Sequence, residues 1–253
     1  MIRIDLNCDL GESFGAWTMG DDAGVMPWIT SANIACGFHA GDFSTMQQTV
    51  LQAKQHDVAI GAHVSLPDLQ GFGRREMKVS TNETYAMTLY QIGALAAFAH
   101  AAGTRVAHVK PHGALYNMAA KDTALADAIA RAVRDFDAHL VLVGRAGSEL
   151  PKAGAAIGLA VAHEAFTDRR YEADGSLTPR SIAGAVIEDA DAAVAQALQI
   201  ATQGSVDVRS GGTLALKAGT LCVHGDRPDA ARFARRLHEA LTSAGVTIAR
   251  HQR

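Results

Sequence analysis

The stretch HVKPHGALYN, residues 108–117, places His108, Lys110 and His112 two residues apart, directly after the run TRVA. Side chains alternate between the two faces of a β-strand, so all three groups share one face. Burying such groups without partners costs several kcal/mol each. The stretch therefore predicts a strand whose polar face lines the interior of a closed parallel barrel and whose other face packs against helices.

Six further apolar runs follow the same plan, each with a helical stretch after it. They are IRIDLNCDL, ITSANIACGFH, VAIGAHVS, HLVLVGR, GLAVAHEAF and GTLCVHGD. Strands that alternate with helices are typical of parallel βα units, and single α/β barrels reach about 250 residues. No linker or composition shift divides the chain. We expect one α/β domain over residues 1–253, a TIM-like (β/α) barrel of about seven parallel strands.

Read at period two, these strands carry their polar residues on one parity and mainly Ile, Leu, Val, Phe and Ala on the other. Besides the opening stretch, the polar parity comprises Asp5, Asn7, Asp9, Asn33, His39, His63, Cys222, His224 and Asp226. The loop-like stretches GESFGAWTMGDDAG, PDLQGFGRREMKVS and TDRRYEADGSLTPR all follow strands. Because that is the active-site end of a parallel barrel, we expect the polar groups to meet one another, a metal or a substrate there.

Helix signals fit between the strands. Ser80 and Glu83 form a capping-box pattern ahead of TYAMTLYQIGALAAFAHAA, and Gly103 lies where a helix ends. Asp42 and Asp226 each precede a helical pattern, where an Asp is a favoured N-cap. We favour the cap role over a site role for both.

Composition excludes several classes of partner. The formal net charge is -3 and lacks the basic surplus typical of proteins that bind nucleic acid or anionic membranes. The polar N-terminus predicts no signal peptide and no run is long enough to span a membrane, so we expect a cytoplasmic protein with a small-molecule substrate. Cys8, Cys36 and Cys222 are expected to be small buried residues, because they are far apart and odd in number.

Taken together, six motifs resemble the LamB/YcsF family over essentially the whole chain. They are DLNCDLGESFG, SANIACGFHAGD, GFGRR, VKPHGALYN, DGSLTPR and CVHGD. The resemblance implies a seven-stranded barrel of the glycoside hydrolase/deacetylase type. It also implies a hydrolase subunit that works with subunits B and C to open 5-oxoproline to L-glutamate while ATP, with Mg, is hydrolysed. No G-x-x-x-x-G-K-[ST] motif is present.

Two stretches depart from the family pattern. AHVSLPD, from Ala62, stands where the family usually reads like AHPGYPD, and FTDRRY, from Phe166, where it reads like FADRAY. The changes at 64–66 alter the loop that follows this strand. The family pattern therefore does not fix the shape of this loop or its substrate contacts.

Site roles follow from the polar parity and the resemblance. Asp9 and Glu12 are candidates for the base, Lys110 for holding the substrate carboxylate or a phosphoryl group, and His112 for donating a proton as the ring opens. Candidate substrate-binding residues are Asn7, Asn33, Arg74, Arg75, Tyr116, Glu164, Asp168, Arg169 and His224. For the three arginines, a solvated loop position is the alternative. The fold resemblance also implies a divalent metal held by Asp9, His39 and His63.

Two rival functions stay open. One is a stand-alone metal-dependent amide or sugar deacetylase that needs neither ATP nor partners. The other is a non-catalytic subunit that only presents substrate to an active site elsewhere in the complex.

Overall fold

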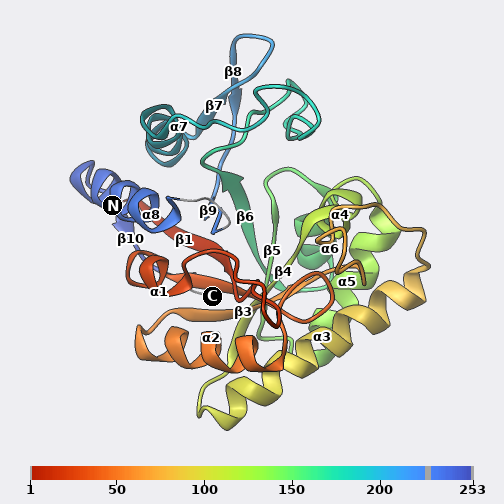
Figure 1. Ribbon diagram of the computed structural model, residues 1–253. Helices are drawn as coiled ribbons and strands as arrows, with labels where there is room; N and C mark the ends of the chain where they lie inside the picture. The colour runs from red at the N-terminus through yellow and green to blue at the C-terminus, as the bar shows by residue number, and fades with distance from the viewer. Residues whose placement is uncertain (1, 226–228, 252–253) are drawn as a thin grey trace.

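A closed parallel barrel forms the centre of the computed structural model, which describes residues 2–225 and 229–251 (Figure 1). The seven predicted strands are confirmed as β1 (Arg3–Leu10), β2 (Ser31–Ala35), β3 (Ala59–Val64), β4 (Val106–Pro111), β5 (Val141–Arg145), β6 (Ala160–Phe166) and β9 (Thr220–Val223). They pair in that order, and β9 pairs back onto β1 to close the barrel. The predicted TIM-like fold class is thus confirmed.

Helices surround the barrel on the outside (Figure 1). They are α1 (Asp22–Val25), a 3-10 turn (Met26–Trp28), α2 (Phe43–Gln55), α3 (Thr81–Ala101), α4 (Gly113–Ala119), α5 (Thr123–Phe136), α6 (Glu149–Ala156), α7 (Ala190–Gln203) and α8 (Ala230–Ser243). None of those in the described ranges is long and apolar enough to cross a membrane.

Two of the predicted helix N-caps, Asp42 and Ser80, are found at the starts of α2 and α3. Ser80 and Glu83 form a reciprocal capping box at α3, and Gly103 follows the helix with a φ of 68°. Asp42 accepts a hydrogen bond from the backbone N–H of Thr45 at 2.8 Å and caps α2, as predicted. The cap predicted at Asp226 lies outside the described residues.

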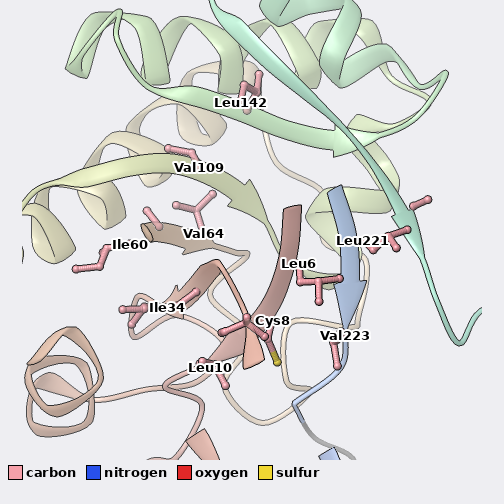
Figure 2. Close-up of a cluster of buried hydrophobic side chains, with 14 of the residues drawn as sticks. Leu6, Cys8, Leu10, Ile34, Ile60, Val64, Val109, Leu142, Leu221 and Val223 are labelled. Carbon is pink, nitrogen blue, oxygen red and sulfur yellow. The ribbon is translucent and has the colours of Figure 1, made fainter. Parts of the chain in front are cut away.

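The apolar parity of the strands packs against the helices. Figure 2 shows Leu6, Cys8 and Leu10 of β1 in one buried cluster with residues of β2, β3, β4, β5 and β9, and all three are almost fully buried. Cys8, Cys36 and Cys222 are buried free thiols, as expected. Because the outer face supplies this apolar burial, the inner face is left for polar groups.

The register aligns the polar parity across neighbouring strands. Asp9 pairs with Asn33, Asn33 with Gly61 and Gly61 with His108. Gly61 has no side chain, so the imidazole of His108 passes over it and its Nε2 lies 2.8 Å from Oδ1 of Asn33. One missing side chain thus lets a ring bridge three strands inside the barrel.

Some elements were not predicted. The strands β7 (Ser205–Asp207) and β8 (Thr213–Ala215) form a hairpin that projects away from the barrel (Figure 1), and β10 (Thr247–Ile248) pairs with the start of β1. Two predicted strands were also too long. β2 ends at Ala35 and β9 at Val223, so His39 and His224 lie in the loops that follow.

Gly61→Ala should destabilise the protein, because the added methyl group would collide with the ring of His108. We expect the free energy of unfolding, measured in urea, to fall by about 3 kcal/mol. Gly93→Ala in α3 is the control. No described atom lies within 4 Å of its added methyl group, and alanine is the better helix former by about 1 kcal/mol. Equal effects at the two positions would contradict the packing described for His108.

Candidate active site

A buried lysine occupies the floor of the site. Nζ of Lys110 lies 2.8 Å from Oδ1 of Asp9 and 2.8 Å from Oε1 of Glu164. It also lies 3.0 Å from Oδ1 of Asn7 and 3.1 Å from Sγ of Cys222. Burial by itself lowers the pKa of Lys110, but Asp9, Cys222 and Glu164 outweigh burial and raise that pKa well above its ordinary value. The side chain is therefore an ammonium ion at neutral pH.

Asp9 connects this lysine to the histidines. Its Oδ2 is 3.3 Å from Nε2 of His63. Burial acts to raise the pKa of Asp9, but His63 and Lys110 outweigh burial and hold the pKa well below its ordinary value. Asp9 is thus a carboxylate at neutral pH, and it lines the pocket above it.

A ladder of amides supports the floor from below. Nδ2 of Asn33 donates to Oδ1 of Asn7 at 2.7 Å and to Oδ1 of Asp9 at 2.8 Å, and Nδ2 of Asn7 donates to Oγ1 of Thr220 at 2.7 Å. Both asparagines were predicted to bind substrate. Both are buried, and they hydrogen-bond to Asp9 and Lys110 at the floor of the cavity, so their binding of substrate stays a prediction.

Two histidines face each other across 3.0 Å, from Nε2 of His63 to Nδ1 of His112. Nδ1 of His63 lies 2.9 Å from the carbonyl oxygen of Lys110, and Nε2 of His112 lies 2.9 Å from that of Phe72. A carbonyl only accepts, so each of these nitrogens carries the ring's hydrogen. Burial and the neighbouring His63 lower the pKa of His112 to about 3, so its ring is neutral. Nδ1 of His112 is therefore an acceptor, and it faces Nε2 of His63.

His39 and Glu12 complete this cluster. The ring of His39 stacks on that of His112 with centroids 3.9 Å apart, and its Nε2 is 3.5 Å from Oε1 of Glu12. Neither ring nitrogen of His39 has a hydrogen-bond partner among the described residues. Burial, with His112 and His63, lowers the pKa of His39 well below its ordinary value. The ring is therefore neutral too.

The floor opens into a cavity of about 380 Å³ at the carboxyl ends of the strands. Asp9, Glu12, His63, Lys110 and His112 line one side of it. The lining also includes the cations Arg74, Lys121, Arg145, Arg169 and Arg180, the carboxylate Glu76, and the apolar residues Phe72, Phe166 and Leu177. The cavity therefore combines carboxylates and imidazoles with several guanidinium groups, which can bind a small anionic ligand.

A fourth histidine lines the cavity beside Arg180. Nδ1 of His224 is 2.7 Å from Oδ1 of Asp168, and its Nε2 is 3.2 Å from a terminal guanidinium nitrogen of Arg180. His224 lines the cavity, whereas Asp168 is buried behind it.

The remaining predicted residues divide between pocket and periphery. Tyr116 lines the cavity and donates its hydroxyl to Oε2 of Glu164 at 2.6 Å, while Arg74 and Arg169 line the rim. Arg75 does not line it. Its side chain is 64% exposed, and its guanidinium pairs with Asp68. Sequence reasoning missed Arg145 and Arg180, although Arg145 ends a strand and Arg180 belongs to the quoted DGSLTPR motif.

A model of the LamB/YcsF family matches residues 4–253. The chain belongs to the LamB/YcsF family. Relatives from Bordetella pertussis and Bacillus subtilis, each named as the A subunit of 5-oxoprolinase, are 60% and 54% identical to it. The alignments cover 97% and 98% of this chain and 97% and 96% of those proteins.

A solved structure agrees with this placement in the LamB/YcsF family. The crystal structure of the lactam utilization protein from Thermus thermophilus matches with a TM-score of 0.93 and 47% identity, over 98% of this chain and 99% of that one. The structure of T48 deacetylase with substrate matches with a TM-score of 0.52 and 13% identity, over 98% of this chain and 87% of that one. This second likeness concerns the fold alone.

The cluster of this LamB/YcsF chain fits a divalent cation. Ligand atoms of Glu12, His39, His63 and His112 all lie within 4.8 Å of one another. A buried imidazole with both nitrogens unsatisfied, beside two further imidazoles and a carboxylate, is an environment that a bound cation would complete. Metal-binding histidines typically donate their other N–H to a carbonyl, as His63 and His112 do. The predicted set of Asp9, His39 and His63 thus gains Glu12 and His112, while Asp9 is engaged with Lys110.

We predict that the purified protein retains about one equivalent of Zn²⁺ or Mn²⁺ after dialysis and that its melting temperature rises with the added ion, because binding stabilises the folded state. His39→Ala should lower both the metal content, measured by mass spectrometry, and the shift in melting temperature. His56→Ala, an exposed histidine at the end of α2, is the control. Failure of the unsubstituted protein to retain or respond to any divalent ion would contradict the prediction.

A buried neutral histidine should make stability depend on pH. Burial lowers the pKa of His108 to about 4, whereas an unfolded histidine titrates near pH 6.5. Between these values the unfolded chain binds the proton and the folded chain does not. The stabilisation is therefore present above pH 6.5 and is lost as the pH falls toward 4. Its loss between pH 7 and 5 is about 2 kcal/mol.

His108→Gln should therefore reduce the drop in unfolding free energy between pH 7 and pH 5 by about 2 kcal/mol. Urea unfolding at the two pH values measures it, and His100→Gln on the exposed face of α3 serves as the control. An unchanged pH dependence in His108→Gln would show that the ring is not buried in its neutral form.

Proposed function

We propose that this chain is the lactam-opening subunit of an ATP-dependent 5-oxoprolinase. It acts with subunits B and C to convert 5-oxoproline to L-glutamate while ATP is hydrolysed to ADP and phosphate. Relatives named as the A subunit of 5-oxoprolinase, at up to 60% identity, support the substrate and the existence of partner subunits. The observation that carries the proposal is the charged floor, where Lys110 is held between Asp9 and Glu164 beneath a small cavity.

The cavity matches the size and charge of the substrate. At about 380 Å³ it accommodates a five-membered lactam that carries one carboxylate. The guanidinium groups of Arg169 and Arg180 on the rim offer paired donors to that carboxylate. The carboxylate and histidine wall then faces the lactam carbonyl.

Hydrolysis of ATP can activate the lactam for attack by water. A five-membered lactam is an unstrained amide whose nitrogen leaves poorly, so direct attack by water is slow. Phosphorylation of the lactam oxygen gives an activated species that water attacks more readily. No G-x-x-x-x-G-K-[ST] motif occurs in this chain, so we assign much of the ATP site to the partner subunits, with Mg as the usual companion of the nucleotide. ATP as co-substrate implies a reaction in the cytoplasm.

Residues of this chain would then perform the hydrolytic half. Asp9, a carboxylate at neutral pH, and Glu12 orient the attacking water, and the ammonium of Lys110 stabilises negative charge that develops on the lactam or phosphoryl oxygens. A divalent ion held by Glu12, His39, His63 and His112 would supply a Lewis acid beside the same floor.

The second candidate is a stand-alone metal-dependent deacetylase. The group of potential metal ligands favours it, because such a site could activate water without ATP. It predicts turnover of acetylated sugars by the isolated chain with zinc or manganese, whereas the lactam-opening function predicts turnover only in the assembled complex with ATP.

Lys110→Met in the reconstituted complex of the three subunits should lower glutamate release about 100-fold or more, because it removes a preorganised charge from the reacting centre. Asp9→Asn, which changes the size of the side chain little, should have a similar effect. Lys152→Met on the exposed face of α6 is the matched control. Glutamate and phosphate are measured separately, and circular dichroism checks folding.

These measurements distinguish lactam opening by this chain from substrate presentation and from deacetylation. Full turnover by folded Lys110→Met and Asp9→Asn complexes would mean that the chain only presents substrate. Acetate release by the chain alone, without lactam opening by the complex, would favour the deacetylase.

A further inference from the structure

We propose that His224 and Asp168 form the proton-transfer dyad that opens the lactam ring, with Arg169 and Arg180 placing the substrate against it. This inference rests on the proposed function and adds a catalytic residue to it. It takes the place of the expectation that His112 donates the proton, because His112 belongs to the group of potential metal ligands.

The tautomer of His224 follows from its two neighbours. A guanidinium can only donate, so Nε2 of His224 accepts from Arg180 across 3.2 Å. The ring's hydrogen is therefore on Nδ1 and is donated to the carboxylate of Asp168, at 2.7 Å from Oδ1 and 2.9 Å from Oδ2. An imidazole held in this way by a buried carboxylate can take up and release a proton at the other nitrogen.

Nε2 is the nitrogen on the side of the cavity. The side chain of His224 is 12% exposed and lines the pocket, whereas that of Asp168 is 1% exposed and lies behind the ring. The ring also stacks on Phe166, with centroids 6.0 Å apart and planes 22° apart, which fixes its orientation. The charged groups around it are Asp168 and Arg180, with Asp9 across the pocket.

Two guanidinium groups beside the dyad call for an anion. Arg169 is almost fully buried and donates to the carbonyl of Thr178 at 2.7 Å, while its Nε has no hydrogen-bond partner among the described residues. Burial and the like charge of Arg180 lower the pKa of Arg169 to about 10. A carboxylate between the two arginines would satisfy the buried Nε and offset their repulsion.

The chemistry of the substrate then places its nitrogen. In 5-oxoproline the carboxylate and the ring nitrogen are bonded to the same carbon. Arg180 lies next to Nε2 of His224, so a carboxylate held by Arg169 and Arg180 brings the ring nitrogen to that same nitrogen. The arginine that binds the carboxylate and the imidazole that protonates the ring nitrogen are therefore adjacent, because the carboxylate and the nitrogen are bonded to one carbon.

The proton balance closes within the site. When Arg180 turns from Nε2 of His224 to the substrate carboxylate, the lone pair of Nε2 becomes free to accept a proton. Water adds its oxygen to the carbon of the phosphorylated lactam, and the water proton passes through Nε2 to the ring nitrogen. The bond between carbon and nitrogen then breaks with its electron pair on nitrogen, and the proton of the new hydroxyl passes to that nitrogen by the same route. The carbon is left as an acyl phosphate, which a second water hydrolyses to the carboxylate and inorganic phosphate. The free amine is formed and the imidazole returns to its neutral form, with Asp168 stabilising the charged ring in between.

His224→Gln in the reconstituted complex should lower kcat for 5-oxoproline at least 100-fold and leave KM within threefold. Arg180→Gln should instead raise KM at least tenfold. Asp168→Asn, which retains the size of the side chain, should follow His224→Gln and guards against a folding defect confined to one variant. His238→Gln, a histidine of α8 that contacts the carbonyl of Trp28, is the control.

A pH profile distinguishes catalysis from structural support. The dependence of kcat on pH that the His224 imidazole confers should be absent in His224→Gln, while a merely structural role would lower kcat at every pH without changing the profile. A folded His224→Gln complex with kcat within fivefold of the unsubstituted one, or with an unchanged profile, would overturn the dyad alone. An unsubstituted complex that does not open 5-oxoproline would overturn the proposed function and the dyad together.

Discussion

The ammonium of Lys110 between the carboxylates of Asp9 and Glu164 is the contact on which the arrangement of the interior depends. Three charges inside a barrel are tolerated only if each has close partners, because the loss of hydration costs several kcal/mol per ion. The amide ladder of Asn7 and Asn33 supplies the remaining hydrogen bonds. Since the inner faces of these strands are committed to polar groups, the outer faces and the helices carry the apolar burial that stabilises the fold.

The same division gives the pocket two unlike walls. On the side of β1 to β4, carboxylates and imidazoles gather, and the cluster of potential ligand atoms there fits a cation. On the side of β6 and the loop that follows it, guanidinium groups call for an anion. A substrate that carries one carboxylate is thereby oriented, because its charged end is attracted by one wall and its reacting carbonyl is turned toward the other.

Much of the floor of the site could be predicted from the alternation of side chains along the strands alone. Period-two reading identified the inward parity of β1 and β4, and therefore Asp9 and Lys110, because a side chain's face depends only on its position in the strand. It put His39 on a strand that ends at Ala35 and it did not single out Arg180, because both residues lie in loops whose paths depend on tertiary packing. Nor could it show which ring nitrogen of His112 is occupied, since that depends on the carbonyl of Phe72, a residue held at a φ of 55°. The strands β7, β8 and β10 have at most three residues each, too few to produce a periodic signal.

The pairing of β1 with β9 has a consequence for synthesis of the chain. Asp5 and Thr220 are hydrogen-bonded although they are 215 residues apart. The first strand to leave the ribosome therefore waits for nearly the last before its barrel can close. Until then the polar face of β1 is hydrated, and its apolar face lacks the helices that are synthesised later. Contacts this distant make folding slow, and the growing chain exposes an unpaired strand edge throughout translation. Chaperone demand should accordingly be set by the time taken to complete the chain rather than by the stability of the finished barrel.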